Sequence, residues 1–200
     1  MLDIQDDISS YLAFSHYIDW NEPSVQRKAK ELKDSTEGEI ELAKAAYYFV
    51  RDEIKHSWDV QDKRVTATAS DALREGVGIC WAKSNLLAAL LRANGIPAGI
   101  CYQRLTLGST PGSGYCIHAL NAIYLRSIDR WIRVDARGNK EGVQADFSVD
   151  DERLAFPIRK EYDEVDYKTV YAEPLPQTMS ILENSTDALY MYLHSLPERI

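Results

Sequence analysis

One stretch of this sequence restricts the fold more than any other, because it reads as a strongly apolar helix with a glycine-rich approach and a sharp end. Residues 76–99 read GVGICWAKSNLLAALLRANGIPAG, with Gly95 and Pro97 as the stop. Its leucines fall on adjoining turns, at positions 86, 87, 90 and 91. A helix this apolar is expected at the centre of a fold, with other elements packed around it.

Cys80 lies where the glycine loop ends and this helix begins. The first turn of a helix has unpaired backbone N–H groups and the positive end of the helix dipole, and both stabilise a thiolate. The alternative is a small buried packing residue, which is what most cysteines on apolar helices are. The flanking Gly76 and Gly78 and the following Trp81 favour a functional cysteine.

Beyond the apolar helix, the hydrophobic pattern changes to the alternation typical of strands. Residues 98–105, 115–125 and 130–134 are rich in Ile, Tyr, Val and Trp, and a short polar turn at 127–129 joins the last two. They are predicted to be adjacent antiparallel strands. The connection at 108–114, GSTPGSG, is either the border of a substrate cleft or an ordinary long hairpin loop.

The flanking sequence favours helices. Residues 1–57 have apolar positions at spacings of three and four, Ser70-Asp71 is predicted to cap a short helix, and residues 179–196 read as a terminal helix. Residues 147–158 are spaced like another strand or a bend. The predicted fold class is therefore α+β, with N-terminal helices and a central cysteine-bearing helix packed on an antiparallel sheet, in one domain over residues 1–200.

The composition excludes several classes of protein. The chain has 23 Lys and Arg against 31 Asp and Glu, and its formal net charge of −8 argues against nucleic-acid binding. No stretch is apolar for the roughly 18 residues of a membrane span, and the acidic N-terminus does not resemble a secretory signal. Three cysteines do not form a disulfide framework, so a cytoplasmic location is expected. The sequence indicates no oligomeric state.

His118 and Asp135 give Cys80 a chemical context. His118 lies in the strand CIHALNAIYL, and Asp135 ends the strand RWIRVD. A hairpin that turns at residues 127–129 brings these two side chains approximately side by side. An activated cysteine nucleophile needs a histidine base and a carboxylate that orients the imidazole, and these residues supply both.

These motifs resemble the core of the transglutaminase-like superfamily. The resemblance rests on the string GxCWxxxxLLxALLRxxGIPA, a histidine on a following strand and a W-x-x-x-D ending at 131–135, and the segment FVRDEIKHSWD at 49–59 is similar to the part that precedes the nucleophile in that superfamily. It covers roughly residues 40–140. It implies a papain-like triad in which Cys80 is the nucleophile, His118 the general base and acid, and Asp135 the carboxylate that orients the imidazole.

Other residues are assigned to the site beside the triad. By analogy with the superfamily, Trp58 is the expected second donor to the oxyanion, with a plain core aromatic as the alternative. Trp81, Arg137 and Asn139 are expected to bind substrate, and the alternative for the last two is a polar turn. His56 is interpreted as an exposed or capping histidine near a helix end, with a side chain that acts in the cleft as the alternative.

The reaction implied is acyl transfer on amide bonds through a thioester, with a peptide, protein or small amide as substrate and hydrolysis favoured over transamidation. Alanine rather than tryptophan follows the histidine, and Ala-Arg rather than Pro-Thr follows the aspartate, which argues against protein cross-linking. Cys101, Cys116 and His118 fall short of a closed zinc site, so neither metal nor cofactor is expected. The competing interpretation is a catalytically inactive binding module with the same fold.

Overall fold

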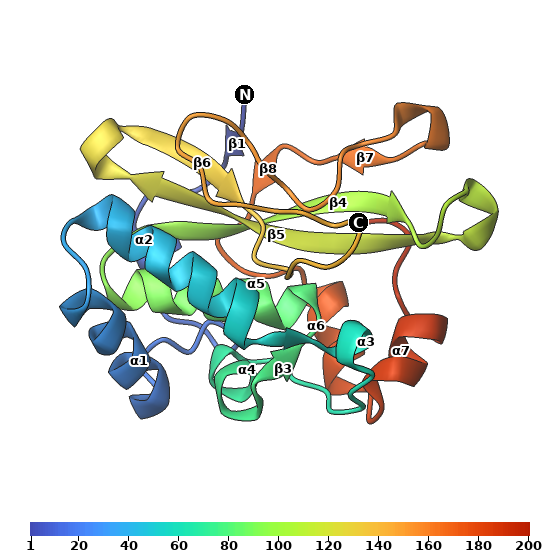
Figure 1. The fold of residues 1–200 in the computed structure, drawn as a ribbon, viewed down its shortest axis with the longest axis horizontal. Coiled ribbons are helices and arrows are strands. Elements are labelled where there is room, and N and C mark those ends of the chain that lie inside the picture. The colour runs from blue at the N-terminus through green and yellow to red at the C-terminus, as the bar shows by residue number, and fades with distance from the viewer.

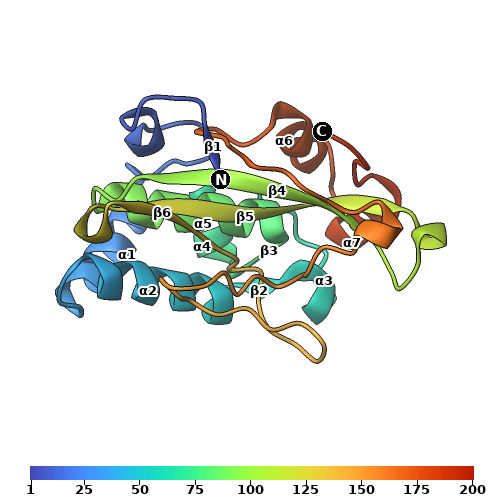
Figure 2. The same ribbon diagram turned by 90° about the horizontal axis from the view of Figure 1, so that it is seen from above.

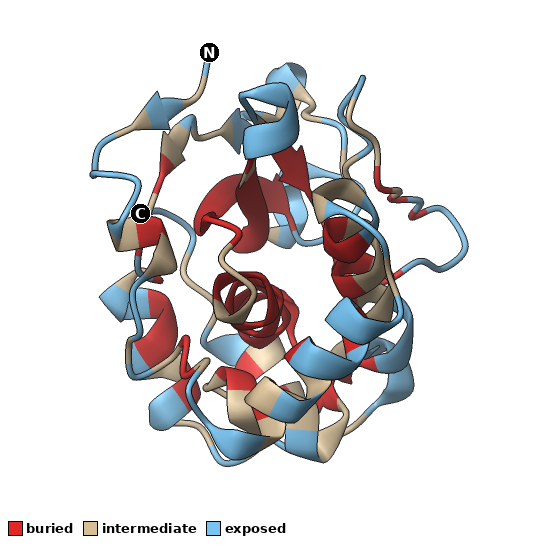
Figure 3. Ribbon diagram, turned by 90° about the vertical axis from the view of Figure 1, so that its left-hand side faces the viewer, coloured by how far each residue is buried: buried red, intermediate tan, exposed pale blue.

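Helix α5 (Cys80–Ala93) lies at the centre of the computed structural model, which describes residues 1–200. Every residue of α5 except Ala93 is buried. Figure 3 shows the helix end-on and buried along its length, while the surrounding helices are buried only on their inner sides. The prediction of a central apolar helix that begins at Cys80 is confirmed.

A four-stranded antiparallel sheet packs on one side of α5. Its strands, in spatial order, are β6 (Arg130–Val134), β5 (Tyr115–Leu125), β4 (Ala98–Thr106) and β7 (Val165–Asp166). The three predicted strands are present, and their ends agree to within one residue. Strand β5 pairs with β6 only from Asn121 to Leu125. The first half of β5, which carries His118, therefore has no strand partner on its β6 side.

The remaining helices form a layer below the sheet in Figure 1. They include α1 (Pro23–Asp34), α2 (Glu39–Tyr48), which runs into a π-turn at Phe49–Glu53, and α4 (Ala69–Glu75). Their apolar residues join α5 and the inner face of the sheet in one cluster of 37 buried residues. The cap of α4 is Thr68, whose side chain accepts a hydrogen bond from the Asp71 N–H, so the prediction of a Ser70-Asp71 cap is wrong.

The N-terminal segment and the segment around β8 cover the other face of the sheet. Strand β1 (Asp3–Ile4) pairs in parallel with β8 (Thr169–Val170), and Figure 1 shows both above the sheet. A second small core there includes Tyr11, Cys101 and Leu120, and it explains why all nine residues of β4 are buried instead of alternating. The prediction of helix is wrong for residues 1–22, which contain one 3-10 turn at Ser10–Leu12.

The C-terminal region contains two helices where one is predicted. Helices α6 (Pro176–Glu183) and α7 (Ala188–His194) are separated because the polar run at 184–187 competes for backbone hydrogen bonds. Asp187 caps α7 by accepting hydrogen bonds from the N–H groups of Leu189 and Tyr190. Residues 147–158 contain neither helix nor strand, which leaves the bend as the correct alternative.

Two short elements lead into the central helix. Strand β2 (Lys55–His56) pairs in parallel with β3 (Val77–Gly78), and helix α3 (Ser57–Val60) follows β2 directly. Figure 2 shows β2, β3 and α3 gathered below one end of the sheet, near α7. None of the helices combines the length and the apolar character that crossing a membrane requires.

Candidate active site

Cys80 is the first residue of α5 and follows a tightly turned loop. Gly76 ends α4 with a φ of +66°, a conformation that favours glycine. Gly78 approaches its neighbours so closely that an added Cβ would lie 2.8 Å from Thr66 Oγ1 and 3.1 Å from Ala82 Cβ. Cys80 is 9% exposed and belongs to the first helical turn, where N–H groups have no partner within the helix. Its thiol therefore lies at the positive end of α5.

His118 and Asp135 form a buried pair. His118 lies on β5, Asp135 directly follows β6, and Nε2 of the histidine is 2.8 Å from Oδ2 of the aspartate. The register of the hairpin makes these side chains diagonal neighbours. Backbone N–H groups of Arg137 and Ala155 donate to the carboxylate, each at 3.1 Å. The carboxylate is thus fixed by three donors and fully shielded from solvent.

The charges of these groups support one another. Burial lowers the pKa of His118, but the negative charge of Asp135 and the neighbouring Cys80 side chain outweigh it and raise the pKa to about 10. Burial raises the pKa of Asp135, whereas the charge of His118 and the hydrogen bonds it accepts lower it, and the net direction is down. The histidine is therefore a cation and the aspartate an anion at neutral pH.

A cavity of about 600 Å³ brings the predicted site residues together. Cys80, His118 and Trp58 all line it. Helix α7 contributes Tyr192, whose ring stacks on Trp58 with centroids 4.5 Å apart and planes inclined by 15°. Phe156, from the loop after β6, meets the His118 ring edge to face, 5.1 Å between centroids. Segments from the first, middle and last thirds of the chain therefore meet in this cavity.

Two of the residues predicted to bind substrate lie at the cavity but have other partners. Arg137 lines the cavity and is held by both carboxylate oxygens of Asp59, with a distance of 2.8 Å from Nη2 to Oδ1. Trp81 is 1% exposed, and its Nε1 donates to the carbonyl of Ile117 at 2.8 Å. Trp81 therefore joins α5 to β5 beneath the site.

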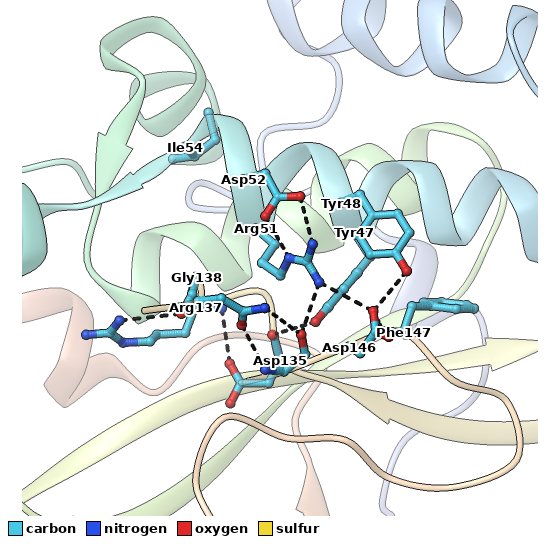
Figure 4. Close-up of polar contacts among 12 residues, drawn as sticks. Tyr47, Tyr48, Arg51, Asp52, Ile54, Asp135, Arg137, Gly138, Asp146 and Phe147 are labelled. Carbon is cyan, nitrogen blue, oxygen red and sulfur yellow. Dashed lines mark hydrogen bonds and ion pairs between the residues drawn. The ribbon is translucent and has the colours of Figure 1, made fainter. Parts of the chain in front are cut away.

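The polar turn after Asp135 is anchored to helix α2 and its π-turn (Figure 4). The Tyr47 hydroxyl donates to the carbonyl of Asp135 at 3.2 Å, and Arg51 donates to the carbonyl of Ala145 at 3.0 Å. Asn139 does not line the cavity and exchanges hydrogen bonds with the backbone of Ala145. Its structural role is therefore the alternative, a polar turn.

His56 is buried, so the interpretation of an exposed histidine is wrong, and it takes the N-cap position of α3 without a capping hydrogen bond from its side chain. It is 5% exposed and lines the same cavity as Cys80 and His118. Its position follows from the pairing of β2 with β3, which sets His56 opposite Gly78, two residues before Cys80. No local sequence pattern indicates so short a parallel pairing between distant segments, which is why a position in the cleft was predicted only as the alternative.

Comparison with known proteins assigns the family. The family model of the transglutaminase-like superfamily matches residues 26–136, more than half of the chain, and the match includes Cys80, His118 and Asp135. The chain belongs to the transglutaminase-like superfamily. The membership inferred from the sequence motifs is confirmed, and the fold agrees with it.

One similar solved structure supports the fold of this superfamily member, and a second is more distant. A candidate cysteine protease from Cytophaga hutchinsonii is 23% identical with a TM-score of 0.53, and the match covers 68% of this chain and 43% of that one. The periplasmic domain of TgpA from Pseudomonas aeruginosa is 20% identical with a TM-score of 0.49, covering 66% and 48%. The chain thus spans less than half of each of these proteins. No curated protein matches the sequence.

Proposed function

We propose that this protein is a thiol-dependent acyl-transfer enzyme that cleaves amide bonds through a thioester on Cys80. The observation that carries the proposal is that His118, which is 2.8 Å from the buried Asp135, shares one cavity with a cysteine at the start of a helix. A cationic imidazole and a helix N-terminus are the two environments that stabilise a thiolate nucleophile. A peptide, a protein or a small amide is the proposed substrate.

The ring nitrogens of His118 have separate tasks in this mechanism. Asp135 holds Nε2, so Nδ1 is the nitrogen left to exchange protons at the reacting groups. The thiolate attacks the carbonyl carbon, and the C–N bond breaks as the imidazolium protonates the departing amine, which leaves the acyl group on sulfur. Water then attacks the thioester while His118 takes its proton, and the carboxylic acid leaves with the thiolate and imidazolium restored.

Water is the proposed acceptor in the second step. Alanines follow both His118 and Asp135 at positions where many superfamily members have tryptophan and proline, and this departure argues against protein cross-linking.

The backbone N–H of Cys80 is the first proposed donor to the oxyanion, because its position in the first helical turn leaves it without a helical partner.

A pre-steady-state assay with p-nitrophenyl acetate tests the proposed function. Wild-type protein is expected to release a stoichiometric burst of p-nitrophenolate, followed by slower turnover that an added primary amine does not accelerate. The variant Cys80→Ala should lose the burst, and Cys101→Ala, which removes a cysteine from the second core, should keep it. A burst that survives Cys80→Ala rejects the nucleophile, and a wild-type protein without any burst favours the inactive binding module.

A further inference from the structure

His56 is a buried side chain of the cavity that has no part in the mechanism above. Strand pairing sets it opposite Gly78, so its backbone lies about one strand spacing, roughly 4.8 Å, from the loop that leads to Cys80. The Tyr192 ring meets the His56 ring edge to face, with centroids 6.3 Å apart and planes inclined by 89°. The imidazole is therefore held in place by a strand on one side and by α7 on the other.

The nitrogens of this ring indicate which of them carries the proton. Nδ1 is sealed from solvent and has no hydrogen-bond partner. A buried N–H without an acceptor is less tolerable than a buried lone pair without a donor, so the proton belongs on Nε2. His56 meets the cavity through the rest of its ring, on the side that carries Nε2 and Cδ2.

The ring is also uncharged. Burial lowers the pKa of His56 well below its usual value, and the positive charges of Arg137 and Lys83 lower it further against the opposite effect of Asp59. A neutral imidazole with its proton on Nε2 is a hydrogen-bond donor. It differs from His118, which is cationic and engaged with Asp135.

Trp58 is less well placed for the same task. It belongs to α3, outside the two-residue pairing that ties His56 to the cysteine loop. Its indole ring stacks on Tyr192, so its orientation is set by a contact with α7. The donor that strand pairing ties to the cysteine loop is therefore the imidazole of His56.

We propose that His56 donates the second hydrogen bond to the oxyanion, from Nε2–H, beside the backbone N–H of Cys80. This inference rests on the proposed function. A neutral donor stabilises the developing negative charge and leaves the thiolate and imidazolium of Cys80 and His118 unchanged.

Two reagents separate this role from a merely structural one. Acetylation of Cys80 by p-nitrophenyl acetate passes through an oxyanion, whereas alkylation by iodoacetamide uses the same thiolate and forms none. The variant His56→Phe keeps an aromatic ring against Tyr192 and removes the donor, so acetylation should slow by about 100-fold with alkylation unchanged. His56→Gln, whose amide reaches the Nε2 position, should restore most of the acetylation rate, and Trp58→Phe should stay near wild type.

Each result decides the proposal. Equal changes in acetylation and alkylation for His56→Phe, or a selective loss of acetylation in Trp58→Phe alone, would overturn it. Should His56→Phe fail to fold, His56→Asn takes its place, because the shorter amide does not reach the Nε2 position and is expected to acetylate slowly. Acetylation that survives Cys80→Ala would reject both the Cys80 nucleophile and the His56 donor. Acetylation that depends on Cys80 but keeps its rate in the His56 variants would reject the His56 donor alone.

Discussion

At the scale of single residues, the three cysteines differ in environment more than in exposure. Burial raises the pKa of Cys101 and of Cys116 to about 12, so both are thiols at neutral pH. Cys116 is nevertheless more exposed than Cys80. Cys80 alone combines the start of a helix with a cationic histidine. Reactivity and accessibility therefore predict different orders of modification.

Iodoacetamide at pH 6 is expected to modify Cys80 ahead of Cys116 and Cys101, because alkylation requires the thiolate. Peptide mapping by mass spectrometry over time measures the three rates within one sample. The variant His118→Gln should slow alkylation of Cys80 by roughly tenfold or more, since it removes the cation that stabilises the thiolate. If Cys116 reacts first, accessibility decides the order and Cys80 is not activated.

At the scale of elements, local patterns predicted the parts of the fold with a strong period of their own. The apolar helix at Cys80 and the strands that carry His118 have such a period, and their bounds agree with the sequence prediction to within a residue. The helix prediction was wrong for the N-terminal 22 residues because apolar side chains there cover a sheet. The prediction of one terminal helix was wrong because Asp187 caps a second one. Long-range pairing, such as β2 with β3, leaves no periodic signal.

The β2–β3 pairing depends on the absence of a side chain at Gly78. The variant Gly78→Ala is expected to lower the free energy of unfolding by about 1–3 kcal/mol, because its Cβ would be 2.8 Å from Thr66 Oγ1. Acetylation of Cys80 should fall as well, since the loop and His56 move together.

Urea unfolding at pH 7 measures the stability of this variant. Gly112→Ala is the matched control, because its added Cβ would meet nothing closer than Thr110 Oγ1 at 3.8 Å, and it should change stability by less than about 0.5 kcal/mol. If Gly78→Ala changes the free energy of unfolding as little as Gly112→Ala does, the loop tolerates a side chain at position 78.

At the scale of the whole molecule, the site is assembled from segments that are far apart in the sequence. Sequence motifs identified Cys80, His118 and Asp135, because these residues lie on elements with local signals. They gave His56 a place in the cleft only as an alternative and did not identify Tyr192, because both positions depend on how β2 and α7 dock on the finished fold. The sequence therefore predicted that Cys80 and His118 share one site. It also placed Trp58, Trp81 and Arg137 there, but it did not predict the part of the cavity wall that α7 contributes.

Acid should destabilise the molecule through the ion pairs that Asp59 makes with Arg137 and Lys140. Burial raises the pKa of Asp59, but hydrogen bonds from Arg137 and Lys140 outweigh it and lower the pKa from 3.8 to about 2. The stability that this carboxylate contributes is present above pH 3.8 and is lost as the pH falls towards 2.

Urea unfolding between pH 7 and pH 3 tests this linkage. Asp59→Asn is expected to be less stable than wild type at pH 7, because it leaves the buried Arg137 charge unpaired. The difference should narrow towards pH 3, where the wild-type carboxylate begins to take up a proton. A constant difference across this range would contradict the assignment of the Asp59 charge.

The most direct test of the account is to find where the acyl group resides. Wild-type protein is mixed with p-nitrophenyl acetate, quenched in acid during the burst, digested and mapped by mass spectrometry. The account predicts an acetyl group on the peptide that contains Cys80, removable by hydroxylamine as a thioester is. Acetyl groups on lysines or the N-terminus, with Cys80 unmodified throughout the burst, would contradict it.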